Sequence, residues 1–306
     1  MFRLQQAIST TRFDYFCKRI LSTPPVQVEA GGLTAVSMVS KRDVLKYLVA
    51  AKTLLLELGE GRPVVLNDGS LEAKDMHLLS LHLRKIGFMN LYDTETGGCP
   101  RGGCWERLVT ILCLARDGYV IQLDSDTITC GVISEVKECY RAKRSFTLGT
   151  GMGRAFVSLE ESARMIEKSS SNHIQVVAER LLRATSDPDT RRYVRGSAGF
   201  AGFAREYFDV ANLERFSIEM QRLTRSRWSD WGFEIAFNYM VANSPIAEVL
   251  SYPRYACFDP RIERQESAFP HFVGPHQYRG QVHSNLARLG IVRLGRKQAA
   301  STAPME

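Results

Sequence analysis

Apolar and polar positions in the first third of the chain predict strands that are each followed by a helix. Residues 33–39 are mostly apolar, which is typical of a buried strand, and residues 44–58 carry apolar side chains at helical spacing. A second pair follows, with a short strand at 63–66 and an amphipathic helix at 71–83. Strands that alternate with helices are typical of α/β folds with a parallel sheet. The pattern therefore predicts a doubly wound α/β sheet.

A third unit of this kind carries polar residues at a position where ligands commonly bind. Residues 94–103 form a loop with glycine and proline, residues 105–114 have helical periodicity, and residues 119–123 are a mostly apolar strand. Asp124 comes directly after this strand. Because ligands of open α/β sheets bind outside the carboxyl ends of the strands, we expect a functional site at Asp124.

The pattern changes in the second half of the chain. Residues 159–185 have a helical pattern with one polar face. The glycine-rich segment 196–202 lacks the preceding apolar strand that a dinucleotide-binding motif requires, so we interpret it as a mobile loop or a close-packed turn. Residues 297–306 are small and polar, which is typical of a frayed end.

Length and pattern together predict the domain organisation. A chain of 306 residues permits one long α/β domain or two small ones, and we favour one domain with additions. The expected parts are an N-terminal helical arm (1–32), the domain (33–290) with a helical insertion (about 159–205), and a C-terminal tail (291–306).

Composition places the chain among ordinary globular proteins. The hydrophobic fraction is 44% and the charged fraction is 24%. No run of about 18 apolar residues occurs, so we expect no membrane span, and the mixed charges of the first residues do not resemble a signal peptide. Seven cysteines without regular pairing favour reduced thiols. We expect a cytoplasmic enzyme, with surface chemistry as the only route to attachment at the inner membrane.

The net charge favours anionic partners. It is +7 at pH 7, with an isoelectric point near 9.1. Nucleotide diphosphates, nucleic acids and acidic membrane surfaces all satisfy this preference, so charge alone does not choose among them.

The motif Asp124-Ser125-Asp126 is the strongest chemical signal in the chain. Its two carboxylates are two residues apart, and at the end of a strand this spacing lets both approach one cation from the same side. Mg²⁺ and Mn²⁺ bind carboxylates together with substrate phosphates. Asp-x-Asp alone is often a turn or a helix cap, but the buried strand before it favours a metal site.

A second segment, FPHFVGPHQYR at 269–279, resembles the HxxG segment of retaining transferases related to glycogenin and the lipopolysaccharide galactosyltransferases. The resemblance implies that His271 is the third metal ligand and that Gly274 lets the backbone approach a donor phosphate. The related enzymes have a lysine shortly afterwards that contacts the diphosphate. This chain has Gln277 at that position, and Arg279 is the candidate replacement.

The resemblance extends upstream of the metal motif. Trp105-Glu106-Arg107-Leu108 resembles the aromatic-x-Arg-Leu helix before the metal strand, which implies that Arg107 binds the donor through its guanidinium. The alternative for Arg107 is a surface ion pair. Arg42 and Asp68 follow the first two strands and are further donor-binding candidates, although each could instead cap the next helix.

Residues 228–234 resemble the acidic segment near the donor sugar and the acceptor. Glu234 and Asp230 are therefore the catalytic candidates. In many related enzymes a glutamine follows the acid, whereas this chain has Ile235, so a role that needs that amide is not carried over. The alternative for Asp230 is the N-cap of a helix.

Together these motifs resemble GT-A type glycosyltransferases, which implies a Rossmann-like, mixed but mainly parallel central sheet flanked by helices. The implied reaction moves a hexose from a nucleotide-diphosphate donor, with a UDP-sugar favoured, to a carbohydrate or other acceptor. Mn²⁺ or Mg²⁺ is the implied cofactor, and Asp124 also belongs to the donor site. The resemblance favours retention, whereas inversion would need Glu234 or Asp230 as a base.

Two alternatives remain at this point. A sugar-phosphate nucleotidyltransferase uses a similar sheet and an acidic metal site, but no glycine-rich phosphate signature follows the first strand. A catalytically silent sugar- or nucleic-acid-binding protein would be consistent with the basic charge and with Gln277 and Ile235. Nucleic acid is not the partner that we expect.

Overall fold

The computed structural model describes residues 11, 13–205, 209–262, 266–278 and 281–301. Arg279, one of the donor-binding candidates, lies outside these residues. Within the described ranges, no helix has both the length and the apolar character needed to cross a membrane.

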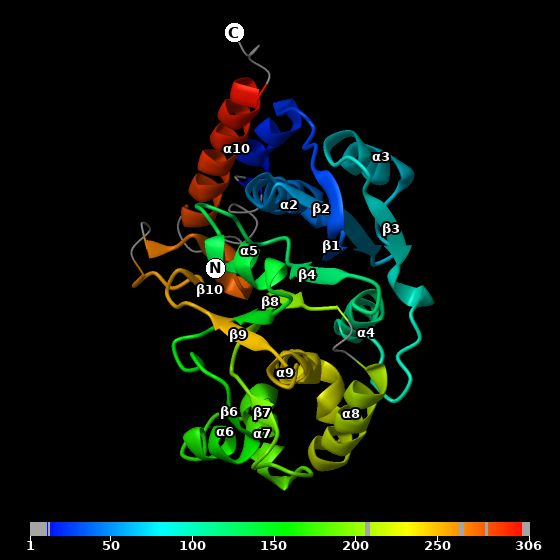
Figure 1. Ribbon diagram of the computed structural model, residues 1–306, viewed down its shortest axis with the longest axis vertical. Helices are drawn as coiled ribbons and strands as arrows, with labels where there is room; N and C mark the ends of the chain where they lie inside the picture. The colour runs from blue at the N-terminus through cyan, green and yellow to red at the C-terminus, as the bar shows by residue number, and fades with distance from the viewer. Residues whose placement is uncertain (1–10, 12, 206–208, 263–265, 279–280, 302–306) are drawn as a thin grey trace. The chain divides into compact units, whose positions relative to one another are not determined.

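The chain divides into two compact units, each assembled from separate stretches of sequence. The first unit comprises Met1–Asn90, Leu123–Ser134 and Pro253–Glu306. Figure 1 labels many of its elements, which are η1 (Lys18–Ser22), β1 (Glu29–Val39), η2 (Lys41–Asp43), α2 (Val44–Leu58), β2 (Glu60–Asn67), α3 (Ala73–His82), β3 (Gly87–Asn90), β10 (Tyr255–Cys257), β11 (Phe269–His271), η7 (Gly274–Tyr278) and α10 (Val282–Ser301).

Helix α2 is the centre of the first unit. It begins and ends where the apolar spacing predicted, and it stops at Gly59, whose left-handed φ of 81° is typical of a helix C-terminus. β1 pairs with β2, and β2 with β3, in parallel register. Helix α2 contacts β1 and β2 on one side and α10 on another, as Figure 1 shows for the blue α2 and the red α10. Helix α10 continues past residue 291, the predicted start of the tail.

The second unit comprises Leu91–Gln122 and Glu135–Tyr252. Its elements are η3 (Leu91–Asp93), α4 (Trp105–Leu114), β4 (Tyr119–Leu123), α5 (Ser134–Arg141), β5 (Ser145–Leu148), β6 (Val157–Ser158), α6 (Leu159–Met165), α7 (Ile174–Leu181), η4 (Leu182–Ala184), β7 (Arg192–Tyr193), β8 (Ser197–Phe203), α8 (Val210–Thr224), η5 (Arg225–Arg227), α9 (Trp228–Ala242) and β9 (Ala247–Leu250).

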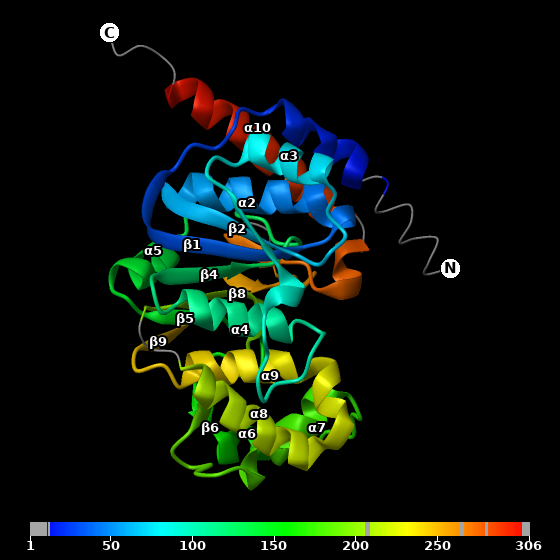
Figure 2. The same ribbon diagram turned by 90° about the vertical axis from the view of Figure 1, so that its right-hand side faces the viewer.

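Aromatic side chains hold the helices of the second unit together. Helices α7, α8 and α9 contact one another, and Figure 2 shows them side by side. Phe216 of α8 stacks on Tyr239 of α9 with ring centroids 3.7 Å apart, and Trp105 of α4 lies 5.6 Å from Trp228 of α9. Such rings bury large apolar areas, so the hydrophobic effect stabilises this cluster.

The central sheet has seven strands in the order β3-β2-β1-β4-β8-β5-β9. β5 pairs with β9 in parallel and with β8 in antiparallel register. Both parallel and antiparallel pairs therefore occur. The predicted architecture, a mixed and mainly parallel sheet flanked by helices, is confirmed.

The prediction for the glycine-rich segment 196–202 was wrong. We expected a loop or a turn, but Ser197–Phe203 is the fully buried strand β8. A Cβ atom added to Gly202 would lie 2.3 Å from Phe146 Cε1 and 2.4 Å from the Tyr119 hydroxyl, so glycine is needed for close packing. The region 159–205 is therefore helical only in its first part, while the domain boundaries remain predictions.

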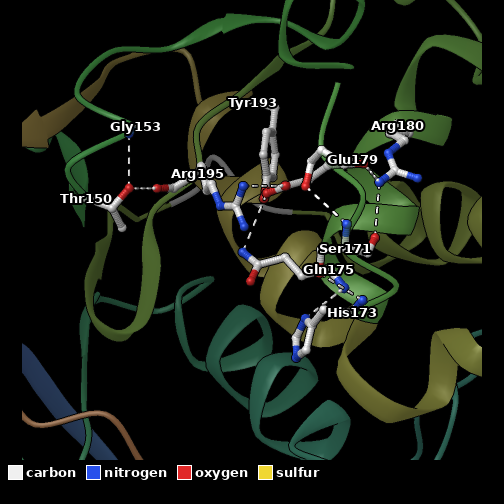
Figure 3. A network of polar contacts seen from close by, with 10 residues as sticks. Thr150, Gly153, Ser171, His173, Gln175, Glu179, Arg180, Tyr193 and Arg195 are labelled. Atoms are coloured by element: carbon white, nitrogen blue, oxygen red, sulfur yellow. Dashed lines mark hydrogen bonds and ion pairs between the residues drawn. The ribbon is translucent and has the colours of Figure 1, made fainter. Parts of the chain in front are cut away.

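A buried polar network connects α7 with β7 and the residues that follow it (Figure 3). Glu179 is 1% exposed. Its Oε1 accepts hydrogen bonds from the Tyr193 hydroxyl at 2.9 Å and from Gln175 Nε2 at 3.5 Å, and its Oε2 lies 3.2 Å from Arg195 Nη1. One oxygen therefore accepts hydrogen bonds, and the other lies in an ion pair with Arg195.

Candidate metal centre

The turn after β4 is held by its own side chains and by β11. Thr127 Oγ1 donates a hydrogen bond to the Asp124 carbonyl at 2.8 Å, which closes the turn that carries Asp126. Thr127 also forms an antiparallel bridge with His271. The backbone N–H of Phe272 donates to the Asp126 carbonyl at 2.9 Å. These bonds place the two acidic residues beside the histidine segment, although the chain separates them widely.

The segment that follows the turn continues to pair with the segment that contains His271. The Ile128 N–H donates to the Pro270 carbonyl at 3.2 Å, and the Cys130 N–H donates to the Ala268 carbonyl at 2.8 Å. Backbone hydrogen bonds of this kind fix the register of two segments, so the position of His271 follows from the ladder rather than from its side chain alone.

Asp124, Asp126 and His271 form one compact group of ligand atoms. His271 Nε2 lies 3.6 Å from Asp124 Oδ2 and 3.1 Å from Asp126 Oδ1, and all three atoms lie within 4.8 Å of one another. Ligand atoms that bind one cation at about 2.1 Å are about 3 Å apart when adjacent and about 4.2 Å apart when opposite. The spacing fits a shared cation after a small adjustment. Carboxylates suit hard divalent cations such as Mg²⁺ and Mn²⁺, whereas an imidazole is more typical of transition-metal sites.

Burial and electrostatic attraction shift the pKa values of Asp126 and His271 in opposite directions. Burial is the largest single influence and disfavours the charged form of both groups, but their mutual attraction, the hydrogen bond between them and smaller contributions from neighbours together outweigh it. The pKa of the Asp126 carboxyl is therefore lowered, and the pKa of the His271 imidazole is raised well above its usual value. In the metal-free protein the imidazole keeps a proton, which a cation would have to displace.

The other side of the His271 ring faces protein groups. Its Nδ1 lies 3.9 Å from Cys257 Sγ. With Nδ1 on the side of Cys257, Nε2 faces the two carboxylates, which is the orientation that a metal-ligating imidazole needs. Nearby, His283 stacks on Phe272 with a centroid distance of 4.4 Å and contacts Phe13 at 4.5 Å, and burial lowers its pKa to about 3. His283 is thus a neutral core residue beside the site.

Two side chains beside Asp126 were not predicted as site residues. Gln277 Nε2 donates a hydrogen bond to Asp126 Oδ2 at 2.8 Å, and Lys46 Nζ donates to Gln277 Oε1 at 3.1 Å. Position 277 drew attention in the sequence because it lacks the lysine of related enzymes. Lys46 gave no signal, since it lies within a helix pattern far from the motifs.

Arg42 and Asp68 lie in the turns after β1 and β2. The Arg42 side chain is 87% exposed and its Nε lies 3.4 Å from Asp43 Oδ2. Arg42 borders a cavity of about 470 Å³ that is also lined by Lys18, Lys41 and Tyr15. This lining carries three cationic side chains and the acidic Asp14, and Lys41 is paired with Glu72, so its net charge is positive but partly compensated.

Asp68 has a defined local role. It accepts hydrogen bonds from the backbone N–H of Ser70 at 3.0 Å and from its hydroxyl at 2.5 Å. Ser70 Oγ in turn accepts from the Lys41 N–H at 2.8 Å, which links the two turns. The alternative that Asp68 caps the next helix is wrong, because Glu72 and Asp75 form the capping box of α3.

Gly274 begins η7 with a φ of 53°, in the left-handed region that favours glycine. A Cβ atom added there would meet nothing within 4 Å, so conformation rather than space requires glycine. This supports a backbone turn at the position that the resemblance assigned to a phosphate contact.

Three candidates lie in the second unit. Arg107 of α4 is buried, so the alternative of a surface ion pair is wrong. Glu234 of α9 is half-buried, and its Oε1 accepts a hydrogen bond from the Ala198 N–H at 2.8 Å. Asp230 is exposed in the first turn of α9 and is not the N-cap, because that helix begins at Trp228 after Arg227. The donor-binding and catalytic roles of these residues remain predictions.

Comparisons with known proteins return similarity in structure only. No family model and no curated protein matches the chain. The apo structure of the bifunctional glycosyltransferase WbbM aligns with a TM-score of 0.49 and 12% identity over 82% of this chain, which spans 47% of that chain. The galactosyltransferase LgtC, in complex with donor and acceptor sugar analogs, aligns with a TM-score of 0.49 and 14% identity over 89% of this chain and 98% of that chain.

A third structure is core-mannan synthase A from Aspergillus fumigatus in a Mn/GDP form. It aligns with a TM-score of 0.41 and 10% identity over 87% of this chain and 88% of that chain. All three alignments have TM-scores below 0.5 and identities of 10–14%.

Proposed function

We propose that this protein is a metal-dependent glycosyltransferase of the GT-A type. The proposal rests chiefly on the cluster of Asp124, Asp126 and His271, which gathers two carboxylates and an imidazole directly after β4. Ligands of open α/β sheets bind at the carboxyl ends of the strands, and this cluster lies at such an end.

The residues of the cluster suit the proposed reaction. A divalent cation held by them would neutralise the negative charge that develops on a departing nucleotide diphosphate. Asp124 and Asp126 supply charge for the cation, and His271 completes a donor set that leaves further positions for phosphate oxygens. Gly274 would allow the backbone to approach those phosphates.

The other assignments belong to the same proposal. Arg42, Asp68 and Arg107 would contact the nucleotide donor, and the exposed, cationic surface around Arg42 supports an anionic ligand. Glu234 would face the donor sugar or the acceptor, with one oxygen already oriented by the Ala198 N–H. We favour a hexose carried on UDP because the histidine segment resembles that of the lipopolysaccharide galactosyltransferases.

A panel of nucleotide-sugars tests this function. The protein is incubated with each donor, with and without Mn²⁺, and release of the nucleotide diphosphate is measured. We expect slow hydrolysis of one donor that stops when the cation is removed by a chelator. Formation of pyrophosphate from a nucleoside triphosphate and a sugar phosphate would instead indicate a nucleotidyltransferase. Tight donor binding without turnover under any condition would indicate a silent binding protein.

A further inference from the structure

Lys46 has one partner at the start of its own helix and another on a distant segment. It is the third residue of α2, and a positive charge near a helix N-terminus is disfavoured by the helix dipole. Its side chain is only 12% exposed, and Nζ lies 2.5 Å from Asp43 Oδ1. The same ammonium group donates a hydrogen bond to Gln277 Oε1 at 3.1 Å. Lys46 thus connects α2 with η7.

The Gln277 amide is held in one orientation by its two neighbours. A lysine ammonium can only donate hydrogen bonds, and an ionised carboxylate can only accept them. Lys46 therefore faces the amide oxygen, and the amide nitrogen faces Asp126, whose Oδ2 accepts its hydrogen bond at 2.8 Å. The amide cannot turn over without losing both bonds.

The two oxygens of Asp126 consequently have different neighbours. Oδ2 accepts from Gln277, whereas Oδ1 lies 3.1 Å from His271 Nε2 on the side of the ligand group. The Asp126 backbone carbonyl is fixed as well, by the Phe272 N–H at 2.9 Å. Hydrogen bonds to the non-ligating atoms of a ligand orient it toward the cation and are often needed for tight metal binding.

We propose that Gln277 is a positioning residue that presents Asp126 Oδ1 to the cation, and that Lys46 acts through Gln277 by fixing its amide. This inference rests on the proposed function, because it assumes the metal site at Asp124, Asp126 and His271. It extends the metal centre to four segments of the first unit, namely the turn after β4, β11, η7 and α2.

The direction in which Mn²⁺ affinity changes when Lys46 is removed distinguishes a positioning role from a purely electrostatic one. A lysine near a cation site repels the cation, so removing its charge should tighten Mn²⁺ binding if charge were its only influence. If Lys46 orients Gln277, its removal also releases the amide and weakens binding. The second effect disappears when Gln277 is absent, so a double-mutant cycle isolates it.

The experiment measures binding of Mn²⁺ alone by titration calorimetry in the full chain and in three variants, Gln277→Met, Lys46→Met and the double variant. All four proteins are compared in thermal stability as a check of folding. We expect Gln277→Met, which leaves the charge unchanged, to weaken Mn²⁺ binding by about 10- to 100-fold. We expect Lys46→Met to weaken binding in the wild-type background but not in the Gln277→Met background.

The outcomes distinguish this inference from the proposed function. Wild-type protein that does not bind Mn²⁺ would overturn the metal site and, with it, both proposals. Wild-type protein that binds Mn²⁺ while Gln277→Met binds equally well would overturn only the role of Gln277. Lys46→Met that shifts the affinity by the same factor in both backgrounds would overturn its action through Gln277. Gln277→Ala removes the same amide and repeats the test if the methionine variant does not fold.

Discussion

Two carboxylates, half-buried Asp126 in the first unit and buried Glu179 in the second, each have a cationic partner, but the composition of the two clusters differs. Asp126 lies beside His271 in the first unit, and Glu179 lies beside Arg195 in the second. The Asp126 cluster combines two carboxylates with one protonated imidazole, so its formal charge is negative. The Glu179 cluster pairs one carboxylate with one guanidinium and is neutral.

The two carboxylates also differ in their protonation. Burial raises the pKa of Glu179 more than Arg195 lowers it, so its pKa lies above the usual value. At Asp126 burial acts in the same direction, but the attraction of the buried His271 is stronger, and the pKa is lowered. Arg195 is 25% exposed, so solvent screens its charge more than that of His271.

The comparison indicates how a structural carboxylate differs from a ligand. Both oxygens of Glu179 face donors supplied by α7 and by the β7 region, which suits a network that stabilises the fold. Asp126 lies beside Asp124 and beside the His271 imidazole, whose proton a cation can replace. We therefore expect changes at Asp126 to affect metal binding and changes at Glu179 to affect stability.

The largest effect is expected from Asp126→Ala. Removal of a ligand should reduce Mn²⁺-dependent release of nucleotide diphosphate on the order of 10³-fold, because the charge of the leaving group is no longer neutralised. Stability should fall by about 1–3 kcal/mol, because the Gln277 amide and the His271 imidazole lose their acceptor although little apolar packing is removed. Steady-state kinetics and denaturant titration measure the two quantities. Near-normal metal-dependent turnover in the folded variant would contradict the comparison.

Glu179→Ala should lower stability without affecting metal binding. It removes the acceptor of Tyr193 and leaves buried donors without a partner, which should lower the free energy of unfolding by about 2–4 kcal/mol. Mn²⁺ affinity should stay within about twofold of the wild type, since no ligand is changed. Chemical denaturation and calorimetry provide the measurements, and Glu179→Gln, which keeps the size and one acceptor, is the matched control. Loss of Mn²⁺ binding in folded Glu179→Ala would contradict the assignment of Glu179 as a purely structural carboxylate.

The pH dependence of metal binding sharpens the contrast. Because the pKa of His271 is raised, the metal-free site holds a proton in the neutral range, and each bound cation should release it. The dissociation constant for Mn²⁺ should therefore fall about tenfold per unit of rising pH until the pKa of His271 is passed. Calorimetry in buffers of different ionisation enthalpy counts the released protons. Binding without proton release at neutral pH would contradict the displacement of a His271 proton by the cation.

The smallest effect concerns the stability of Glu179→Gln as a function of pH. Because the folded-state pKa of Glu179 is raised, the folded protein binds this proton more tightly than the unfolded chain does. The wild type should lose stability as the pH rises through that pKa, whereas glutamine does not titrate. The free energy of unfolding of the variant relative to the wild type should therefore increase from about pH 4 to pH 7. A decrease over this interval would contradict the assigned shift.

Most of the fold could be predicted because local patterns and tertiary packing agree. The strand 119–123 and the helices 44–58 and 105–114 have the predicted bounds. β8 was missed because its glycines and alanines have low strand propensity and show no alternation. Glycine is needed at position 202 because Phe146 and Tyr119 pack closely against it, and this proximity is visible only in the folded structure.

The candidate site could be predicted only in part, for a similar reason. Asp124 and Asp126 follow one strand and are visible as a local motif, and His271 was found through a resemblance. Lys46 and Gln277 were missed as a pair because the chain separates them by 231 residues. Their relation to Asp126 depends on hydrogen bonds among three segments, which no local spacing encodes.

The most direct test of the central claim is a crystal structure with Mn²⁺ and a nucleoside diphosphate, with anomalous scattering used to locate the cation. We predict one anomalous peak at about 2 Å from an oxygen of Asp124, an oxygen of Asp126 and Nε2 of His271, with phosphate oxygens at the remaining positions. A cation bound elsewhere while these three side chains keep their mutual hydrogen bonds would contradict the account.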